Sequence, residues 1–151
     1  MESNLPDEGA VQPAGKRAAR RVLLAEGDAV LSDLYAKRLE EDGWSVEVVH
    51  DGQVALNRTL ESPPDVLLMN TVPGLELRAL LERIRDHEPI KELAVILLAN
   101  SYDDLELQEV DDLKVLGILI KSHSIRKDLS ATIRGLLESR DRAGEESVEA
   151  S

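Results

Sequence analysis

Polar residues follow the apolar runs of this chain at the points where the runs end. The four clusters are Glu26-Gly27-Asp28, Asn70-Thr71, Ala99-Asn100-Ser101 and Lys121-Ser122. Their side chains supply carboxylates, amides, hydroxyls and one ammonium group, so they can form ion pairs and hydrogen bonds. If the apolar runs are parallel strands, their carboxyl ends meet at one edge of a sheet, where ligands of such sheets bind. We therefore expect the functional site of the protein at these residues.

Several other chemistries are excluded or disfavoured by the residues present. The chain has no cysteine, which excludes disulfides, thiolate metal sites and cysteine nucleophiles. His50, His87 and His123 lie in three separate segments without ligand spacing, so we expect ordinary surface histidines, with at most a weak anion site where His123 neighbours Lys121. The clusters also lack a glycine-rich phosphate loop, a Ser–His pair and aromatic residues that could hold a flavin ring. A flavin-binding or hydrolytic enzyme is therefore a minor alternative.

The apolar runs predict five strands that are covered on both faces, because short solid runs without alternation are typical of parallel sheets. The runs are Val22–Ala25, Val46–Val49, Val66–Met69, Val95–Ala99 and Val115–Ile120. Stretches with helical spacing lie between and after them. Five strand-then-helix units in order predict an α/β protein with a doubly wound parallel sheet.

Four of the helical stretches have an apolar face. The faces are Leu31, Leu34, Tyr35 and Leu39; Val54, Ala55, Thr59 and Leu60; Leu77, Leu80, Leu81 and Ile84; and Ile125, Leu129, Ile133, Leu136 and Leu137. Asp28 is expected to cap the first helix, and Asp51 with Gly52 leads into the second. The stretch 102–113 is a weaker helix because its few apolar residues lie among many acids.

The composition predicts one folded domain between two loose ends. The hydrophobic fraction of 42% is sufficient for a core, which residues 21–139 would form. Residues 1–20 and 140–151 lack an apolar period and are expected to be a flexible N-terminal arm and a flexible acidic C-terminal tail. No apolar run approaches the roughly 20 residues that span a bilayer, and residues 1–8 do not resemble a signal peptide. We expect a cytoplasmic protein that does not bind membranes.

The charge of the chain argues against nucleic acid as a partner. The sequence has 18 Lys and Arg against 30 Asp and Glu, which gives a formal net charge of -12. Proteins that bind nucleic acids neutralise phosphates with basic side chains, and this acidic balance disfavours such contacts.

The order of the segments resembles a known family. The matching segments are Val22–Asp28, Leu39–Val46, Asp51–Leu56, Pro64–Asn70, Ile84-Arg85, Ala94–Leu98 and Leu119–Lys121. Together they resemble the receiver domain of bacterial two-component response regulators, over about Arg21 to Arg140. The resemblance implies a flavodoxin-like (βα)5 fold, a three-layer sandwich whose five-stranded parallel sheet has the order 2-1-3-4-5. It also implies a phosphoryl group accepted by an aspartate beside a bound magnesium ion.

The family positions that this chemistry needs are altered in this chain. The acidic pair, the acceptor aspartate, the Thr or Ser and the Lys of the family correspond here to Glu26 and Gly27, Asn70, Ala99 and Lys121. An amide is a poor nucleophile, a glycine offers no carboxylate, and an alanine has no hydroxyl. Asp28 lies one residue beyond the acidic pair and is expected to point into the first helical turn. Glu26 and Lys121 balance each other's charge, so we expect an ion pair and no cofactor, with no tightly bound magnesium or other metal.

Three further departures concern the switch of the family. Ile118 stands where the family usually has an aromatic residue that moves on phosphorylation, and Ser122 replaces a proline. The loop from Asn70 to Leu77 is several residues shorter than usual. These departures indicate a pseudo-receiver that does not switch in the usual way.

The sequence therefore favours a stand-alone receiver-like signalling protein of a two-component or phosphorelay system. It would not be an enzyme, would not be phosphorylated at the usual position and would act through protein–protein contact. The alternative is a single-domain response regulator with an unconventional acceptor such as Thr71 or Asp28. The partner would be a histidine kinase or another signalling protein, and the chain would be a monomer or weak homodimer. The candidate interaction face consists of Asp103, Asp104, Glu106, Glu109, Asp111 and Asp112.

Overall fold

The computed structural model describes residues 20–70, 72–99, 113–121 and 129–150, with residues 143–150 as backbone alone. Within these ranges, five parallel strands form one sheet in the spatial order β3-β2-β4-β5-β6. The strands are β2 (Arg21–Ala25), β3 (Ser45–Val49), β4 (Val66–Met69), β5 (Ala94–Ala99) and β6 (Gly117–Ile120). Counted along the chain, this is the predicted order 2-1-3-4-5.

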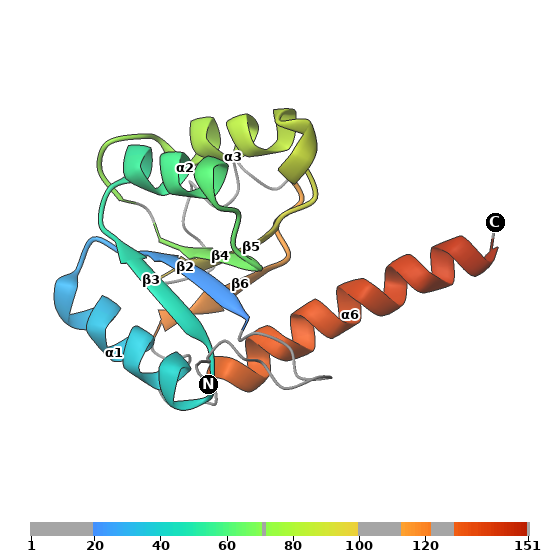
Figure 1. The fold of residues 1–151 in the computed structure, drawn as a ribbon, viewed down its shortest axis with the longest axis horizontal. Helices are drawn as coiled ribbons and strands as arrows, with labels where there is room; N and C mark the ends of the chain where they lie inside the picture. Colours follow the sequence, from blue (N-terminus) through green and yellow to red (C-terminus); the bar gives the residue numbers. More distant parts are fainter. Residues whose placement is uncertain (1–19, 71, 100–112, 122–128, 151) are drawn as a thin grey trace, which may run out of the picture.

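The helices cover both faces of the sheet. They are α1 (Ala29–Glu41), α2 (Gly52–Glu61), α3 (Leu77–Asp86), a short 3-10 helix η1 (Glu88–Ile90) and α6 (Leu129–Ala150). Figure 1 shows α2 and α3 above the sheet and α1 and α6 below it. The α/β flavodoxin-like three-layer sandwich is confirmed.

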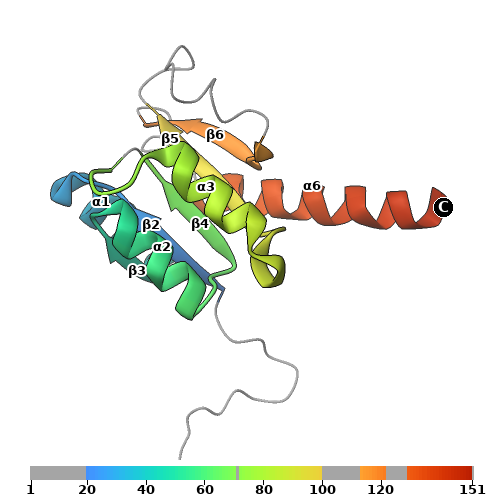
Figure 2. The same cartoon turned by 90° about the horizontal axis from the view of Figure 1, so that it is seen from above.

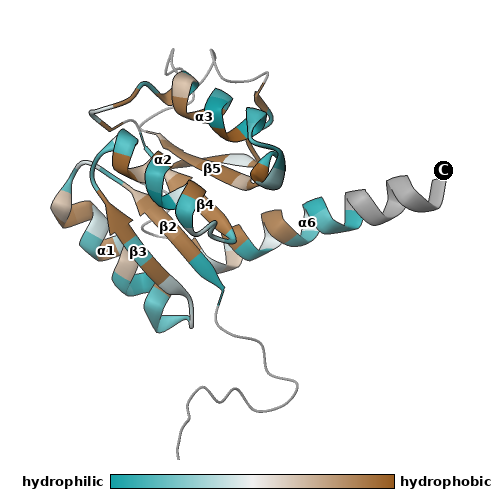
Figure 3. Cartoon of the chain, turned by 45° about the horizontal axis from the view of Figure 1, so that its top comes forward, coloured by the Kyte–Doolittle hydropathy of each residue, from teal (hydrophilic) through white to brown (hydrophobic). Residues whose placement is uncertain are grey.

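Two apolar cores lie on the two faces of the sheet because alternate strand residues point in opposite directions. In β2, Leu23 and Ala25 face the core shared with α2 and α3, whereas Val22 and Leu24 face the core shared with α1 and α6. The alternation continues in β4 and β5, which are buried along their whole length. Figure 3 shows these strands as the most apolar part of the fold.

The first two helices begin where the sequence predicts, whereas two residues that were expected to be buried are exposed. The Asp28 and Asp51 side chains cap α1 and α2 by accepting hydrogen bonds from main-chain N–H groups of the first turn. Leu34 and Val54 were expected in the apolar faces but are 38% and 43% exposed. A helix lying on a flat sheet buries only a strip of its circumference, so residues at the edges of the apolar arc remain in solvent.

The last helix extends further than the sequence indicated. α6 continues to Ala150, past the boundary placed at residue 140, and its second half projects beyond the sheet (Figures 1 and 2). Residues 140–150 are rich in Glu, Arg and Ala, which favour a helix by intrinsic propensity even without an apolar period. The predicted arm (1–20) and the predicted fourth helix (102–113) fall almost wholly outside the described residues. Among the helices that are described, none is long and apolar enough to cross a membrane.

Candidate functional site at the carboxyl ends of the strands

The fold brings the predicted clusters to one edge of the sheet. Ala25 of β2 pairs with Met69 of β4, so Glu26 and Asn70 leave neighbouring strands side by side. The main-chain N–H of Asn70 donates to the carbonyl of Ala25 at 2.9 Å, and this hydrogen bond holds the ends of the two strands together. On the other side of β4, the buried Ala99 ends β5 and pairs with Ile120, the residue before Lys121. Thr71, Asn100, Ser101, Ser122 and His123 lie outside the described residues.

A buried ion pair occupies the centre of this edge. Lys121 Nζ lies 3.1 Å from Glu26 Oε1, and the two side chains are 13% and 2% exposed. The expected pairing of these residues is confirmed. The other carboxylate oxygen, Oε2, accepts the main-chain N–H of Asp28 at 3.1 Å. Oε1 has no partner in hydrogen-bond geometry within the described part of the chain, so the lysine charge is what stabilises it.

Tyr35 of α1 belongs to the site, although the sequence indicated only a core position for it. Its ring is fully buried and its hydroxyl donates to the main-chain carbonyl of Lys121 at 3.4 Å. Burial, together with the negative charge of Glu26, raises the pKa of Tyr35 to about 12. A usable signal was present, because a tyrosine on an apolar helix face needs a partner for its hydroxyl.

Two further residues hold the loop that carries Glu26. Asp28 Oδ1 accepts from the main-chain N–H groups of Val30 at 2.9 Å and Leu31 at 3.2 Å, so Asp28 points into the first turn of α1 as expected. His50 is exposed, as expected of a surface histidine, and its Nδ1 lies 2.7 Å from the carbonyl oxygen of Glu26. His87, also exposed, ends α3 far along the chain from this loop.

The short loop between β4 and α3 closes against the start of α2. The N–H of Gly52 donates to the carbonyl of Pro73 at 2.7 Å. Gly74 has a φ of 98°, and a Cβ there would overlap the Asp51 carboxylate, so only glycine fits. The loop therefore forms the rim of the site beside Gly27, where a Cβ would lie 3.9 Å from Pro73 Cδ.

The remaining predicted residues divide between the core and the undescribed part of the chain. Ile118 of β6 is partly buried and packs against the core under α2 and α3. The candidate interaction face, Asp103 to Asp112, lies outside the described residues. Across the described ranges, no group of three or more His, Asp or Glu side chains is arranged to hold a metal ion. Glu26 is engaged by Lys121 and Asp28 by the helix, so neither of these two carboxylates is free to hold a magnesium ion in the described part of the site.

The raised pKa of Tyr35 predicts a loss of stability in alkali. The unfolded chain releases the tyrosine proton near pH 10, whereas the folded protein keeps it to about pH 12. The unfolded state then binds fewer protons, so the free energy of unfolding falls as the pH rises between these values, by at most about 2.7 kcal/mol. Urea unfolding of the wild type and Tyr35→Phe at about pH 9 and about pH 11 measures this difference. The variant lacks the ionising group, so equal alkaline losses in both proteins would contradict the prediction.

Solved structures that share this fold include response-regulator receivers. The chemotaxis response regulator CheY4 of Vibrio cholerae matches 78% of this chain and 98% of its own, with a TM-score of 0.70 and 19% identity. The receiver domain of a signal transduction histidine kinase from Syntrophus aciditrophicus matches 80% of this chain and 92% of its own, with a TM-score of 0.69 and 22% identity. A structure from a family of streptococcal redox sensors that evolved from two-component response regulators has a TM-score of 0.73 and 23% identity, over 85% of this chain and 55% of its own. The fold is that of a receiver.

Curated relatives are transcriptional regulators. SphR of Synechococcus elongatus, the alkaline phosphatase synthesis transcriptional regulatory protein, is 30% identical over 132 residues, 76% of this chain and 49% of SphR. TrcR of Mycobacterium tuberculosis is 36% identical over 69 residues, 45% of this chain and 27% of TrcR. This chain thus spans about half the length of SphR and less of TrcR. No protein-family model matches the chain.

Sequence and fold together place the chain in a family. The described part of this chain is a response-regulator receiver domain.

Proposed function

We propose that this receiver domain is a pseudo-receiver, which signals by contact with a protein partner and does not accept a phosphoryl group at the usual position. The observation that carries the proposal is the Glu26–Lys121 ion pair at 3.1 Å, at the same end of the sheet as Asn70. The lysine that would neutralise a phosphoryl group already neutralises a buried carboxylate. Asn70 supplies no anionic oxygen to attack phosphorus.

The charge of the site also supports the proposal. Gly27, Asn70 and Ala99 are uncharged, and the charges of Glu26 and Lys121 cancel. A neutral site does not attract a divalent cation strongly, and neither magnesium nor another cofactor is part of the proposed function. The function that we propose is accordingly not an enzymatic one.

Proteins with this fold also include sensors of another kind. The streptococcal relatives in structure are redox sensors that evolved from response regulators. This chain contains no cysteine, so a thiol-based redox signal is excluded for it. We propose instead that the domain binds a partner protein, for which a histidine kinase is one candidate. SphR and TrcR are transcriptional regulatory proteins, so the absence of nucleic-acid binding stays a prediction from the acidic charge.

The alternative is phosphorylation at an unconventional acceptor, Asp28 or Thr71. Asp28 is disfavoured because its Oδ1 receives two main-chain hydrogen bonds that cap α1, and phosphorylation would remove the cap. Thr71 lies outside the described residues.

Incubation with a small phosphodonor tests the proposal. The wild-type protein is mixed with acetyl phosphate and magnesium chloride and its intact mass is followed, with an active receiver domain as a parallel control. We expect no added phosphoryl group in this protein and a clear adduct in the control. An adduct would reject the proposal, and mapping of the modified peptide would then distinguish Asp28 and Thr71 from Asn70 or a deamidated form of it.

A further inference from the structure

A cavity lies at the end of the sheet opposite the strand-end site. It has a volume of about 570 Å³, within the range of roughly 300–1,000 Å³ that is typical of small-molecule pockets. Ala94 begins β5 and Leu116 directly precedes β6, so the cavity opens at the amino ends of these strands. Ala99, at the other end of β5, is about 17 Å away at roughly 3.3 Å per residue. The two sites are separate.

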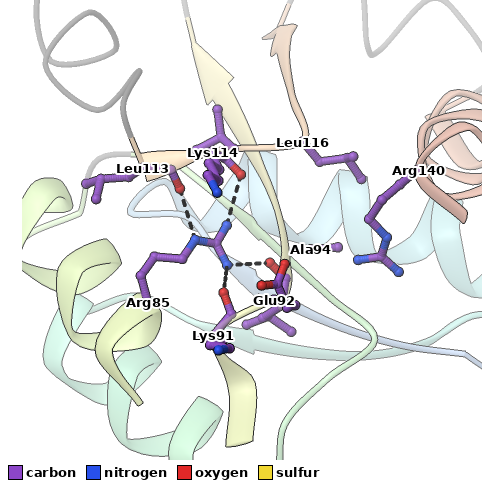
Figure 4. Close-up of a pocket in the computed structure, with 10 residues that line it drawn as sticks. Arg85, Lys91, Glu92, Ala94, Leu113, Lys114, Leu116 and Arg140 are labelled. Carbon is purple, nitrogen blue, oxygen red and sulfur yellow. Dashed lines mark hydrogen bonds between the residues drawn. The ribbon is translucent and has the colours of Figure 1, made fainter. Parts of the chain in front are cut away.

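The cavity is positively charged in a protein that is acidic overall. Four cationic side chains line it, Arg85, Lys91, Lys114 and Arg140, against the single carboxylate of Glu92. They come from α3, from the segments before β5 and β6, and from α6. Figure 4 shows Arg140 reaching from α6 toward the cavity, opposite Arg85. In a chain with a net charge of -12, four cationic side chains against one carboxylate are a local excess of positive charge.

Arg85 builds the wall of the cavity. Its guanidinium donates to four main-chain carbonyls, those of Lys91, Leu93, Leu113 and Lys114, at 2.8–3.0 Å. Four of its five N–H donors are therefore used, and all four acceptors are neutral carbonyl groups and not carboxylates. Burial lowers the pKa of Arg85, and the charge of Glu92 opposes this shift only in part. The side chain is thus a rigid, incompletely neutralised positive charge beside the cavity.

The other cations have hydrogen-bond donors to offer. Lys114 is exposed, and the structure gives no acidic partner for it among the described residues. Its φ of 58° is left-handed, a conformation that places its carbonyl on Arg85 at 3.0 Å. Among the described residues, Arg140 pairs with its neighbour Asp141 at 3.4 Å, whereas Lys91 is paired with Glu88 at 2.6 Å. Lys114 and Arg140 are therefore the donors best placed for a ligand.

The remaining wall is apolar. Leu93, Leu113 and Leu116 are also among the lining residues, and each is partly buried against one of the two apolar cores. A cavity with a cationic rim and an apolar floor fits an anion that carries an apolar or planar body. We propose that this cavity binds a phosphate-bearing small molecule such as a nucleotide, with Lys114 and Arg140 on the phosphate and the leucine side chains against the body. Ammonium and guanidinium groups form charge-assisted hydrogen bonds with phosphate oxygens, which are stronger than neutral ones.

Calorimetric titration with pyrophosphate and with ADP tests this site. Both are used with EDTA at constant ionic strength, so that neither magnesium nor bulk screening contributes. We expect saturable binding of ADP with a Kd below about 1 mM, and weaker binding of pyrophosphate because it lacks the body. No saturable binding of either probe would overturn the proposal.

Matched variants locate the binding. Lys114→Gly removes the charge and suits the left-handed backbone, so the fold is retained, and we expect ADP to bind about tenfold more weakly. Arg140→Gln should act in the same direction. Lys37→Gln removes an exposed charge from α1 and should leave the affinity unchanged. Equal affinity in the wild type and Lys114→Gly, or an equal loss in Lys37→Gln, would place the ligand elsewhere and overturn the proposal. Neither result bears on phosphorylation at the strand-end site.

Discussion

Replacement of Lys121 by methionine is expected to lower the free energy of unfolding by about 3 kcal/mol. The change keeps much of the side-chain volume and leaves the carboxylate of Glu26, 2% exposed, without its counter-charge. Removal of one partner of a buried ion pair is costly because the other charge stays desolvated. Urea unfolding at neutral pH, followed by the fluorescence of the single tryptophan, measures the difference.

The double variant Glu26→Gln/Lys121→Met shows whether the pairing is the cause. Without a buried charge it should regain at least about half of the lost stability, since the coupling between contacting residues is what a double-mutant cycle isolates. Lys37→Met, at an exposed position of α1, is the matched control and should stay within about 0.5 kcal/mol of the wild type. A loss below about 1 kcal/mol in Lys121→Met would mean that the ion pair does not hold the site together.

The sheet was predictable because its strands are buried on both faces and therefore appear as solid apolar runs. The predicted strand at Val115 nevertheless begins later, at Gly117. Lys114 adopts a left-handed φ and turns its carbonyl to Arg85, so the chain enters β6 after this turn. That contact joins residues 29 apart in sequence and leaves no local pattern.

The strand-end site was predictable for a different reason. In a parallel sheet the carboxyl ends of neighbouring strands share one edge, so Glu26, Asn70 and Lys121 had to converge once the strand order was known. Tyr35 was not predicted as part of the site because its hydroxyl contact with Lys121 spans 86 residues. Arg85 was likewise identified only as part of a family segment, since the carbonyls that it binds are brought together by the fold.

The double variant Gly27→Asp/Asn70→Asp is expected to gain magnesium-dependent phosphorylation, which we do not expect of the wild type. It would place three carboxylates, those of residues 26, 27 and 70, at the edge where Lys121 supplies the positive charge. The backbone allows both changes. Asn70→Asp is nearly isosteric, and a Cβ on Gly27 would make only ordinary van der Waals contact with Pro73 Cδ. Intact mass after incubation with acetyl phosphate, with and without magnesium chloride, measures the gain.

A control variant with the same two kinds of substitution shows whether the position of the new carboxylates, rather than the added negative charge, causes the phosphorylation. Asn57→Asp/Gly135→Asp converts an exposed amide of α2 and a helical glycine with open space around it, and we expect no adduct. The single variant Asn70→Asp should bind magnesium at least about tenfold more weakly than the double variant, because a magnesium site needs more than one carboxylate. A double variant that folds and binds magnesium but accepts no phosphoryl group would show that Asn70 and Gly27 alone do not explain the expected lack of phosphorylation. The missing hydroxyl at Ala99 and the short rim around Pro73 would then be the cause.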